Sequence, residues 1–170
     1  ASYAIGAVDV ALWDLRARLA GLPLCDLLGR RRERVPVYGS GGFTSLDLDG
    51  LRAQCREWMA QGMRAVKIKV GRDHGADVDR VRVTREAIGP ECALMIDANG
   101  GYDAAGAIGF AHRIARYDVV WFEQPVDPRD HAGMRRVRAA LPPGMALSSG
   151  EYITDTADAP WTVIKSNDKK

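Results

Sequence analysis

The sequence predicts an α/β protein, a partial (β/α) barrel of the TIM type with five strand–helix units. Short apolar runs alternate with stretches of helical periodicity over residues 35–158. Polar residues also recur at the ends of these runs, 28, 26 and 28 positions apart: Lys69, Asp97, Glu123 and Glu151. A strand–helix unit of a parallel barrel takes about 30 residues, and such barrels carry their chemistry at the carboxyl ends of the strands.

Residues 1–34 precede the first predicted strand. Apolar residues spaced 3, 4, 3 and 4 positions apart predict one face of a helix: Ile5, Val8, Leu12, Leu15 and Leu19. Gly21 and Pro23 end this helix. Residues 24–34, which include a basic run, are expected to form a solvated connector.

The remaining elements alternate strictly. Strands are predicted at 35–40, 65–70, 93–97, 119–123 and 145–150. Helices are predicted between them, at about 47–61, from Asp77 as the capping residue to 88, at 103–116 and at 130–141. This alternation predicts a parallel sheet. A doubly wound open sheet alternates in the same way, but acidic residues at one depth of successive strands favour a barrel, whose strand ends face one centre.

Composition is typical of a globular protein, with 46% hydrophobic and 27% charged residues among 170. A net charge of +2 gives no reason to expect nucleic acid or a membrane surface as a partner. The three cysteines form no C-x-x-C pair, and Cys55 and Cys92 lie in apolar patterns, so buried thiols are expected. No apolar run approaches the ~20 residues of a membrane span. These features predict a cytoplasmic protein.

The two ends of the chain predict a fragment. Only five strands can be counted, whereas a complete barrel has eight. The sequence has 5 lysines and 19 arginines, yet three of the lysines fall in the last six residues. We expect residues 1–34 to be a helix and connector, residues 35–158 a partial barrel with a metal site, and residues 159–170 an atypical tail.

The three carboxylates predict a magnesium site. Asp97, Glu123 and Glu151 each supply anionic oxygen, the donor that Mg²⁺ prefers in its octahedral shell. No thiol or imidazole shares their spacing, which argues against zinc or copper. Each carboxylate alone could equally cap a helix or pair with an arginine; the regular spacing of three favours a common ligand set.

Two lysines on one strand predict an acid–base group. Lys67 and Lys69 alternate with Val66, Ile68 and Val70, so both point to the same side of the strand. Two ammonium groups beside a metal cation disfavour each other's charge, which lowers lysine pKa values. A lysine shifted toward neutrality can serve as a general base. The alternative is an edge strand with solvated lysines.

Asn99 follows Asp97 by two positions and precedes Gly100 and Gly101. Its amide is a candidate substrate-binding group, for a hydroxyl or a carboxylate. A turn-forming asparagine before two glycines explains it equally well.

The chain resembles the enolase superfamily, in particular the mandelate racemase/muconate lactonizing group. The matching segments appear in the family's order: Ala7–Asp14, Lys67–Lys69, Asp97–Asn99, Trp121–Pro125 and Gly150–Glu151. Glutamate after glycine at the third ligand position resembles the mandelate racemase subgroup. Features that the family adds are not visible here, among them most of a capping domain, a His–Asp pair and a further glutamate on later strands.

The resemblance implies Asp97, Glu123 and Glu151 as Mg²⁺ ligands. It implies Lys69 as the base that takes the proton α to a carboxylate, with Lys67 beside it tuning its basicity. Mg²⁺ then offsets the charge of an enediolate formed when the proton leaves. The implied activity is that of a racemase, epimerase or dehydratase acting on a 2-hydroxy acid or a sugar acid.

Two functional hypotheses follow. The first is a Mg²⁺-dependent enzyme whose 170-residue fragment has little or no turnover. The second is a non-catalytic barrel fragment that binds metal weakly or serves only in assembly. Strands with open edges at 35–40 and 145–150 would pair with another copy, so homo-oligomers or self-association are expected.

Overall fold

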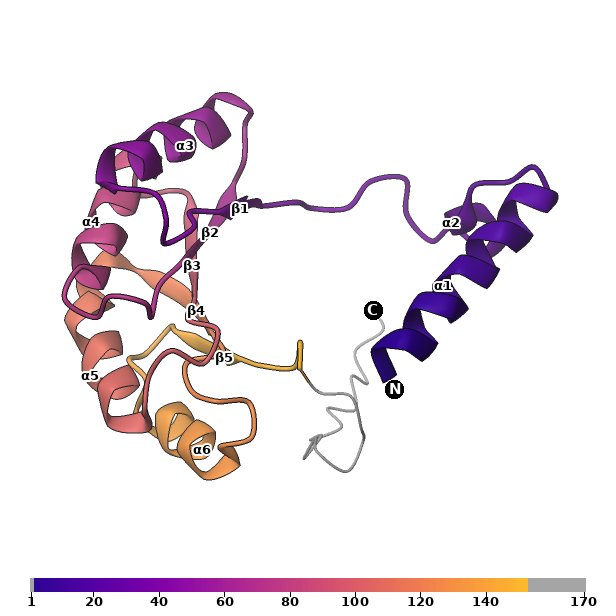
Figure 1. The fold of residues 1–170 in the computed structure, drawn as a ribbon. Helices are drawn as coiled ribbons and strands as arrows, with labels where there is room; N and C mark the ends of the chain where they lie inside the picture. The colour runs from indigo at the N-terminus through magenta and orange to yellow at the C-terminus, as the bar shows by residue number, and fades with distance from the viewer. Residues whose placement is uncertain (1, 153–170) are drawn as a thin grey trace. The chain divides into compact units, whose positions relative to one another are not determined.

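The computed structural model describes residues 2–152, which fall into two units. The first unit ends at Pro36 and the second begins at Val37. Each unit is described by itself below, with the elements labelled as in Figure 1.

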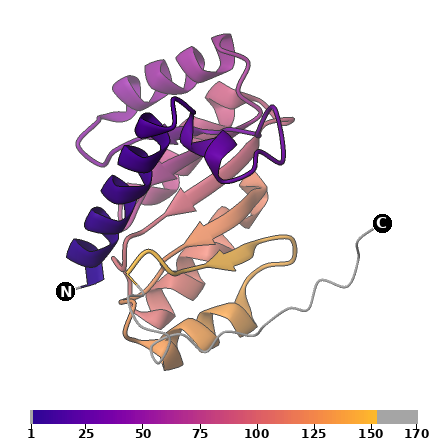
Figure 2. The same cartoon turned by 90° about the vertical axis from the view of Figure 1, so that its right-hand side faces the viewer.

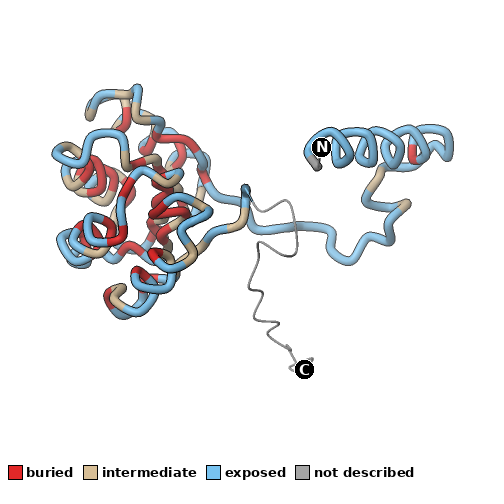
Figure 3. Tube along the Cα trace, turned by 60° about the horizontal axis from the view of Figure 1, so that its bottom comes forward, coloured by how far each residue is buried: buried red, intermediate tan, exposed pale blue. Residues whose placement is uncertain are grey.

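The first unit contains two helices, α1 (Ser2–Leu19) and α2 (Leu24–Leu27). The predicted first helix is confirmed, and it ends before Gly21, which has φ of 66°. The short α2 lies in the region expected to be a connector. Figure 3 shows that α1 is almost entirely exposed. Among residues 3–19 only Ala17 is buried, while Ile5 and Val8 are 69% and 60% exposed.

The second unit is a five-stranded parallel sheet in the order β1-β2-β3-β4-β5. Its strands are β1 (Gly39–Gly41), β2 (Ala65–Lys69), β3 (Ala93–Asp97), β4 (Val119–Glu123) and β5 (Ala146–Ser148). Its helices are α3 (Leu48–Ala60), α4 (Asp77–Ile88), α5 (Ala104–Ile114) and α6 (His131–Ala140), with a 3-10 turn at Ala115–Tyr117.

The helices α3 to α6 lie on one side of this sheet (Figures 1 and 2). The strand order follows the chain without a reversal, whereas a doubly wound sheet reverses its order and carries helices on both faces. The unit therefore has the winding of a barrel segment, as the recurring acidic residues predict.

The first strand differs from its prediction. We expected residues 35–40, but β1 is formed by Gly39–Gly41, and Val35 and Val37 are exposed. A Cβ atom on Gly39 would lie 2.5 Å from the ring of Trp58, so close packing against α3 requires glycine there. The strand consequently carries no apolar signal of its own.

Three of the four sheet-covering helices begin at an aspartate N-cap. Asp47, Asp103 and Asp130 each accept a hydrogen bond from the backbone N–H of a glycine three residues later. The fourth, α4, has Ala76 as its N-cap, so the prediction that Asp77 caps this helix is wrong. Asp77 is fully buried in the first turn and accepts hydrogen bonds from Gly71 N and the Tyr102 hydroxyl.

The core lies between the sheet and its helices, where Figure 3 shows most of the buried residues. Phe122, Leu94 and Ile96 of the strands and Phe110 of α5 have no exposed surface. Tyr102, Phe110 and Phe122 form an aromatic group with ring centroids 5.2–6.3 Å apart. The thiols of Cys55 and Cys92 are buried, as predicted. Among residues 2–152, no helix has the length and apolarity needed to cross a bilayer.

Candidate metal centre

The sheet brings the predicted polar residues to one edge. Lys69, Asp97 and Glu123 are each the last residue of their strand, and the parallel register pairs Lys69 with Asp97 and Asp97 with Glu123. The same row continues to Ser148 at the end of β5, three residues before Glu151. Neighbouring strands lie about 4.8 Å apart, so side chains in this row reach one another.

Three carboxylates meet at this edge. One oxygen each from Asp97, Glu123 and Glu151 lies within 4.8 Å of the others. The Asp97 side chain is 1% exposed and that of Glu123 17%, while Glu151 is exposed. All three donors are anionic oxygens, which matches the preference of Mg²⁺. The residues present therefore fit a hard divalent cation.

Both lysines of β2 point toward these carboxylates. Lys69 Nζ donates to Asp97 Oδ2 at 2.5 Å, and Lys67 Nζ donates to Glu123 Oε2 at 2.7 Å. Lys67 Nζ also lies 3.9 Å from Asp97 Oδ2. Their side chains are 12% and 25% exposed for Lys67 and Lys69, so neither is a freely solvated edge lysine.

The carboxylates beside Lys67 decide its electrostatics. Burial is the largest single effect and disfavours the charge on Lys67, but the hydrogen bond to Glu123 and the charges of Glu123, Tyr38 and Asp97 together raise the pKa of the lysine. Burial likewise opposes the charge on Glu123, and the hydrogen bonds from Lys67 and Trp121 lower the pKa of that carboxyl group. The pKa of Lys67 is raised because its nearest charged neighbour is a carboxylate. The expected lowering concerns lysines beside a metal cation, and it stays a prediction.

Asn99 connects the base candidate to the third carboxylate. Its Oδ1 accepts a hydrogen bond from Lys69 Nζ at 2.8 Å, and its Nδ2 donates to Glu151 Oε1 at 2.8 Å. Its backbone N–H donates to Asp97 Oδ1 at 3.0 Å. The residue has φ of 46°, in the left-handed region that asparagine tolerates. Asn99 is thus both a turn residue and a member of the cluster.

The structure adds two aromatic residues that the sequence analysis did not select. The Trp121 indole N–H donates to Glu123 Oε2 at 3.2 Å, and the Tyr38 ring lies 5.6 Å from Lys67 Nζ. Trp121 precedes Glu123 by two positions, so strand alternation places both side chains on one face. That spacing is the signal by which Trp121 could have been found.

A buried arginine holds the loops beside the cluster. Arg80 of α4 donates to the carbonyl oxygens of Gly42, Phe43 and Leu46 in the β1–α3 loop, at 2.6, 3.0 and 2.8 Å. It also donates to the carbonyl of Lys69 at 3.3 Å. One guanidinium group thereby fixes the loop after β1 against the end of β2.

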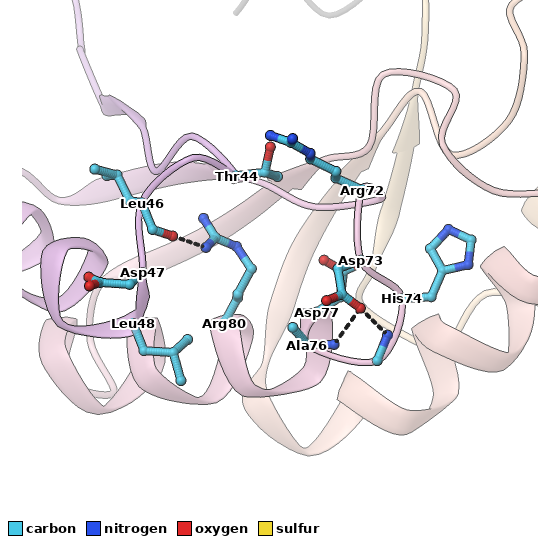
Figure 4. A pocket seen from close by; sticks show the side chains of 11 residues that line it. Thr44, Leu46, Asp47, Leu48, Arg72, Asp73, His74, Ala76, Asp77 and Arg80 are labelled. Carbon is cyan, nitrogen blue, oxygen red and sulfur yellow. Dashed lines mark hydrogen bonds between the residues drawn. The ribbon is translucent and has the colours of Figure 1, made fainter.

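A pocket of about 770 Å³ opens at the amino end of α4 (Figure 4). Thr44, Arg72, His74 and Arg80 are among its lining residues, and the three clustered carboxylates are not. Its wall mixes acidic and basic side chains and includes Asp47, Asp73 and Asp77. This pocket therefore does not coincide with the candidate metal centre.

A sequentially wound parallel sheet with carboxylates and lysines at its carboxyl edge defines a barrel-type α/β chain with a candidate acid–base metal centre. Comparison with models of protein families identifies the family to which this barrel-type chain belongs. A model described as "Enolase C-terminal domain-like" matches residues 50–163, and one described as "Mandelate racemase / muconate lactonizing enzyme, N-terminal domain" matches residues 1–29. The chain belongs to the mandelate racemase/muconate lactonizing group of the enolase superfamily.

Curated relatives include several enzymes of sugar acids. The chain is 38% identical over 156 residues to L-talarate/galactarate dehydratase of Salmonella typhimurium, covering 91% of this chain and 39% of that protein. It is 41% identical over 154 residues to 3,6-anhydro-alpha-L-galactonate cycloisomerase of Streptomyces coelicolor, covering 90% and 42%. The chain thus spans about two fifths of the length of these relatives.

Solved structures agree with this assignment. A mandelate racemase/muconate lactonizing enzyme-like protein from Rubrobacter xylanophilus is 47% identical with a TM-score of 0.87, over 92% of this chain and 44% of that one. A racemase from Streptomyces coelicolor with bound magnesium is 40% identical with a TM-score of 0.82, over 92% and 44%. L-talarate/galactarate dehydratase from Salmonella typhimurium, liganded with Mg and L-lyxarohydroxamate, is 35% identical with a TM-score of 0.78, over 89% and 39%.

Proposed function

We propose that the protein to which this chain belongs abstracts the proton α to the carboxylate of a sugar acid or 2-hydroxy acid with the help of Mg²⁺. The observation that supports this most directly is the short contact between Lys69 Nζ and Asp97 Oδ2 within a cluster of three carboxylates. The cluster supplies a place for a divalent cation, and the lysine supplies a proton acceptor beside it.

In this proposal Asp97, Glu123 and Glu151 hold the metal ion. When bound, Mg²⁺ supplies a Lewis acid that stabilises negative charge developing on the substrate carboxylate. Lys69 accepts the α-proton at Nζ, and Lys67, whose Nζ donates to Glu123 Oε2 at 2.7 Å, lies beside it as the group that tunes its basicity. Asn99, held between Lys69 and Glu151, keeps the two groups at a fixed separation and offers its amide to a substrate hydroxyl.

The substrate class is proposed from the relatives. Those compared above are named for dehydration and cycloisomerisation of sugar acids, and hydrophobic dipeptide epimerases are also similar, at 35% identity in one case. Proton removal next to a carboxyl group is common to dehydration and epimerisation of such acids. We further propose residues 1–34 as the capping-domain side, 35–158 as the barrel part and 159–170 as an atypical tail. The whole of 159–170, and the end of the barrel range from residue 153, lie outside the described residues.

A second candidate is a non-catalytic fragment that self-associates. It is favoured by the edges of the sheet, because β1 pairs only with β2, and β5 only with β4, within the described residues. Unpaired strand edges are templates for pairing with another chain. Light scattering over a range of protein concentration tests this candidate, and a monomer at all concentrations would exclude it.

Calorimetric titration with Mg²⁺ tests the metal centre. We expect binding by the chain, loss of that binding in Asp97→Asn, and unchanged binding in Asp79→Asn, an exposed aspartate on α4. Equal binding by the chain and Asp97→Asn would refute the site.

Exchange of the α-proton of a sugar acid in deuterated water, catalysed by the full-length protein to which this chain belongs and followed by proton NMR with Mg²⁺ present, tests the base. We expect exchange to be lost in Lys69→Ala. Exchange that is unchanged in this variant would remove Lys69 from the proposal.

A further inference from the structure

Trp121 lies on the same face of β4 as Glu123 and precedes it by two residues, so it lies closer to the middle of the sheet than the polar groups at the strand ends. It pairs in register with Met95 of β3 and Ala146 of β5. Its indole ring is half-buried, whereas Phe122 beside it points to the helix side and is fully buried. The proposed acid–base chemistry leaves this tryptophan without a role.

One oxygen of Glu123 receives two hydrogen bonds. Oε2 accepts from Trp121 Nε1 at 3.2 Å and from Lys67 Nζ at 2.7 Å. Within residues 2–152, the other oxygen, Oε1, accepts none of the hydrogen bonds found. The two carboxylate oxygens of Glu123 are therefore chemically distinct, with one held by the protein.

We propose that Trp121 is a positioning residue for the metal centre: its indole N–H fixes the rotation of the Glu123 carboxylate so that this ligand is preorganised. The proposal rests on the function proposed above, since it assigns Trp121 a task only if Glu123 binds metal. Trp121 acts through Glu123 and does not itself touch the metal ion or the substrate.

The indole group suits this task for physical reasons. Its N–H is a donor only and cannot exchange roles with an acceptor. The side chain has only two rotatable bonds and is half-buried, so the position of the donor is restricted. Lys67 makes the shorter, charge-assisted bond to the same oxygen, but its ammonium group sits on a long flexible chain, so it restricts the orientation of the carboxylate less than the indole does. Hydrogen-bond partners of metal ligands typically change metal affinity by about 10- to 100-fold when removed.

The test compares Trp121→Phe with the matched control Trp58→Phe by calorimetric titration with Mg²⁺. Phenylalanine keeps an aromatic ring at position 121 and removes only the N–H donor. Trp58 is a buried tryptophan of α3 that packs on β1 and has no contact with Glu123 among the interactions found. We expect about 10-fold weaker Mg²⁺ binding for Trp121→Phe and unchanged binding for Trp58→Phe, although both lose a similar packing volume.

Urea unfolding of the same three proteins separates positioning from packing. A structural role alone would lower the free energy of unfolding of Trp121→Phe without a specific loss of Mg²⁺ affinity, and that result would overturn the proposal. Equal Mg²⁺ affinity of the chain and Trp121→Phe would overturn it as well, while leaving the proposed function intact. Absence of Mg²⁺ binding by the unsubstituted chain would instead overturn the proposed function, and this inference with it.

A second measurement examines the hydrogen bond directly, without metal. The indole N–H resonance of Trp121 is identified in nitrogen–proton NMR spectra by its absence from Trp121→Phe. In Glu123→Ala we expect this resonance to move upfield, because its acceptor is gone, and the resonance of Trp58 to stay in place. A Trp121 resonance that does not move in Glu123→Ala would show that the indole does not hold this carboxylate, and the proposal would be wrong.

Discussion

A single guanidinium group, that of Arg80, donates to three carbonyl oxygens of the β1–α3 loop. Its side chain is buried and donates to Gly42, Phe43 and Leu46 of the β1–α3 loop and to Lys69 of β2. Hydrogen bonds to charged groups contribute about 1.5–3 kcal/mol each, and buried acceptors left without donors are costly. Arg80 is thus a structural link between the loop after β1 and the strand that carries both lysines.

Replacement of Arg80 by Met is expected to lower the free energy of unfolding by about 3 kcal/mol, because methionine keeps the apolar stem but removes the charged donor from four carbonyl oxygens. The carbonyls of Gly42 and Phe43 keep the backbone N–H groups of Lys69 and Leu46 as donors, whereas the carbonyl of Leu46 loses its partner. Urea unfolding followed by circular dichroism measures the change.

Arg82→Met on the same helix is the control. Arg82 pairs with Asp79 and Glu86 at the surface, so its loss should cost less than about 1 kcal/mol. Equal costs for the two variants would contradict the assigned role of Arg80.

At the residue scale the sequence predicts positions better than contacts. Lys69, Asp97 and Glu123 are each the last residue of a strand, as their spacing predicts. A strand end can be predicted because it follows directly from the short apolar run before it in the sequence. The buried role of Arg80 was not predicted, since α4 contains three arginines and tertiary packing decides which is enclosed. Its helical spacing from Asp77, Thr84 and Ile88, which are all buried, is the signal that was available.

Two loops approach each other at a pair of glycines. A Cβ atom on Gly101, in the β3–α5 loop, would lie 2.4 Å from the backbone oxygen of Gly71, in the β2–α4 loop. His74 and Tyr102 reinforce the contact by stacking with ring centroids 4.2 Å apart, and His74 Nε2 lies 2.9 Å from the Gly101 carbonyl oxygen. The loops that follow Lys69 and Asp97 are therefore held together by backbone proximity.

Gly101→Ala is expected to destabilise the protein by about 1–3 kcal/mol, because the backbone of Gly71 cannot yield as a flexible side chain would. Thermal and urea unfolding measure the effect. Gly109→Ala provides the same chemical change in the middle of α5, where nothing lies within 4 Å of the added methyl group. That variant should gain about 0.5–1 kcal/mol, since alanine favours helix over glycine. A loss of stability in both, or in neither, would refute the close approach.

The helices and central strands follow from their apolar periodicity, and β1 shows where such reasoning fails. A strand made of Gly39, Ser40 and Gly41 has no hydrophobic pattern. Its position is decided by the ring of Trp58, which occupies the space of a side chain at Gly39. Contacts with residues distant in sequence thus override the local preference of Val35 and Val37 for extended structure.

The reactivity of the three thiols shows whether the hydrophobic core of the protein is closed. Cys25 is exposed, whereas Cys55 and Cys92 are buried in the hydrophobic core between the sheet and its helices. Burial raises the pKa of the Cys55 and Cys92 thiols, which reduces the reactive thiolate at neutral pH.

One thiol per chain is therefore expected to react rapidly with Ellman's reagent in native buffer, and all three of the chain's cysteines in urea. The Cys25→Ser variant is the control and should show no rapid phase. Rapid reaction of more than one thiol in native buffer would show that the core is open.

The order β1-β2-β3-β4-β5 has a consequence for biosynthesis. Each strand pairs with the strand made just before it, and each sheet-covering helix packs beside its predecessor in the chain. A nascent polypeptide leaving the ribosome can therefore add one unit at a time to a growing platform, without waiting for a distant segment. Because the carboxylates arrive in the same order, the ion-binding edge would be assembled stepwise, with Glu151 contributed last.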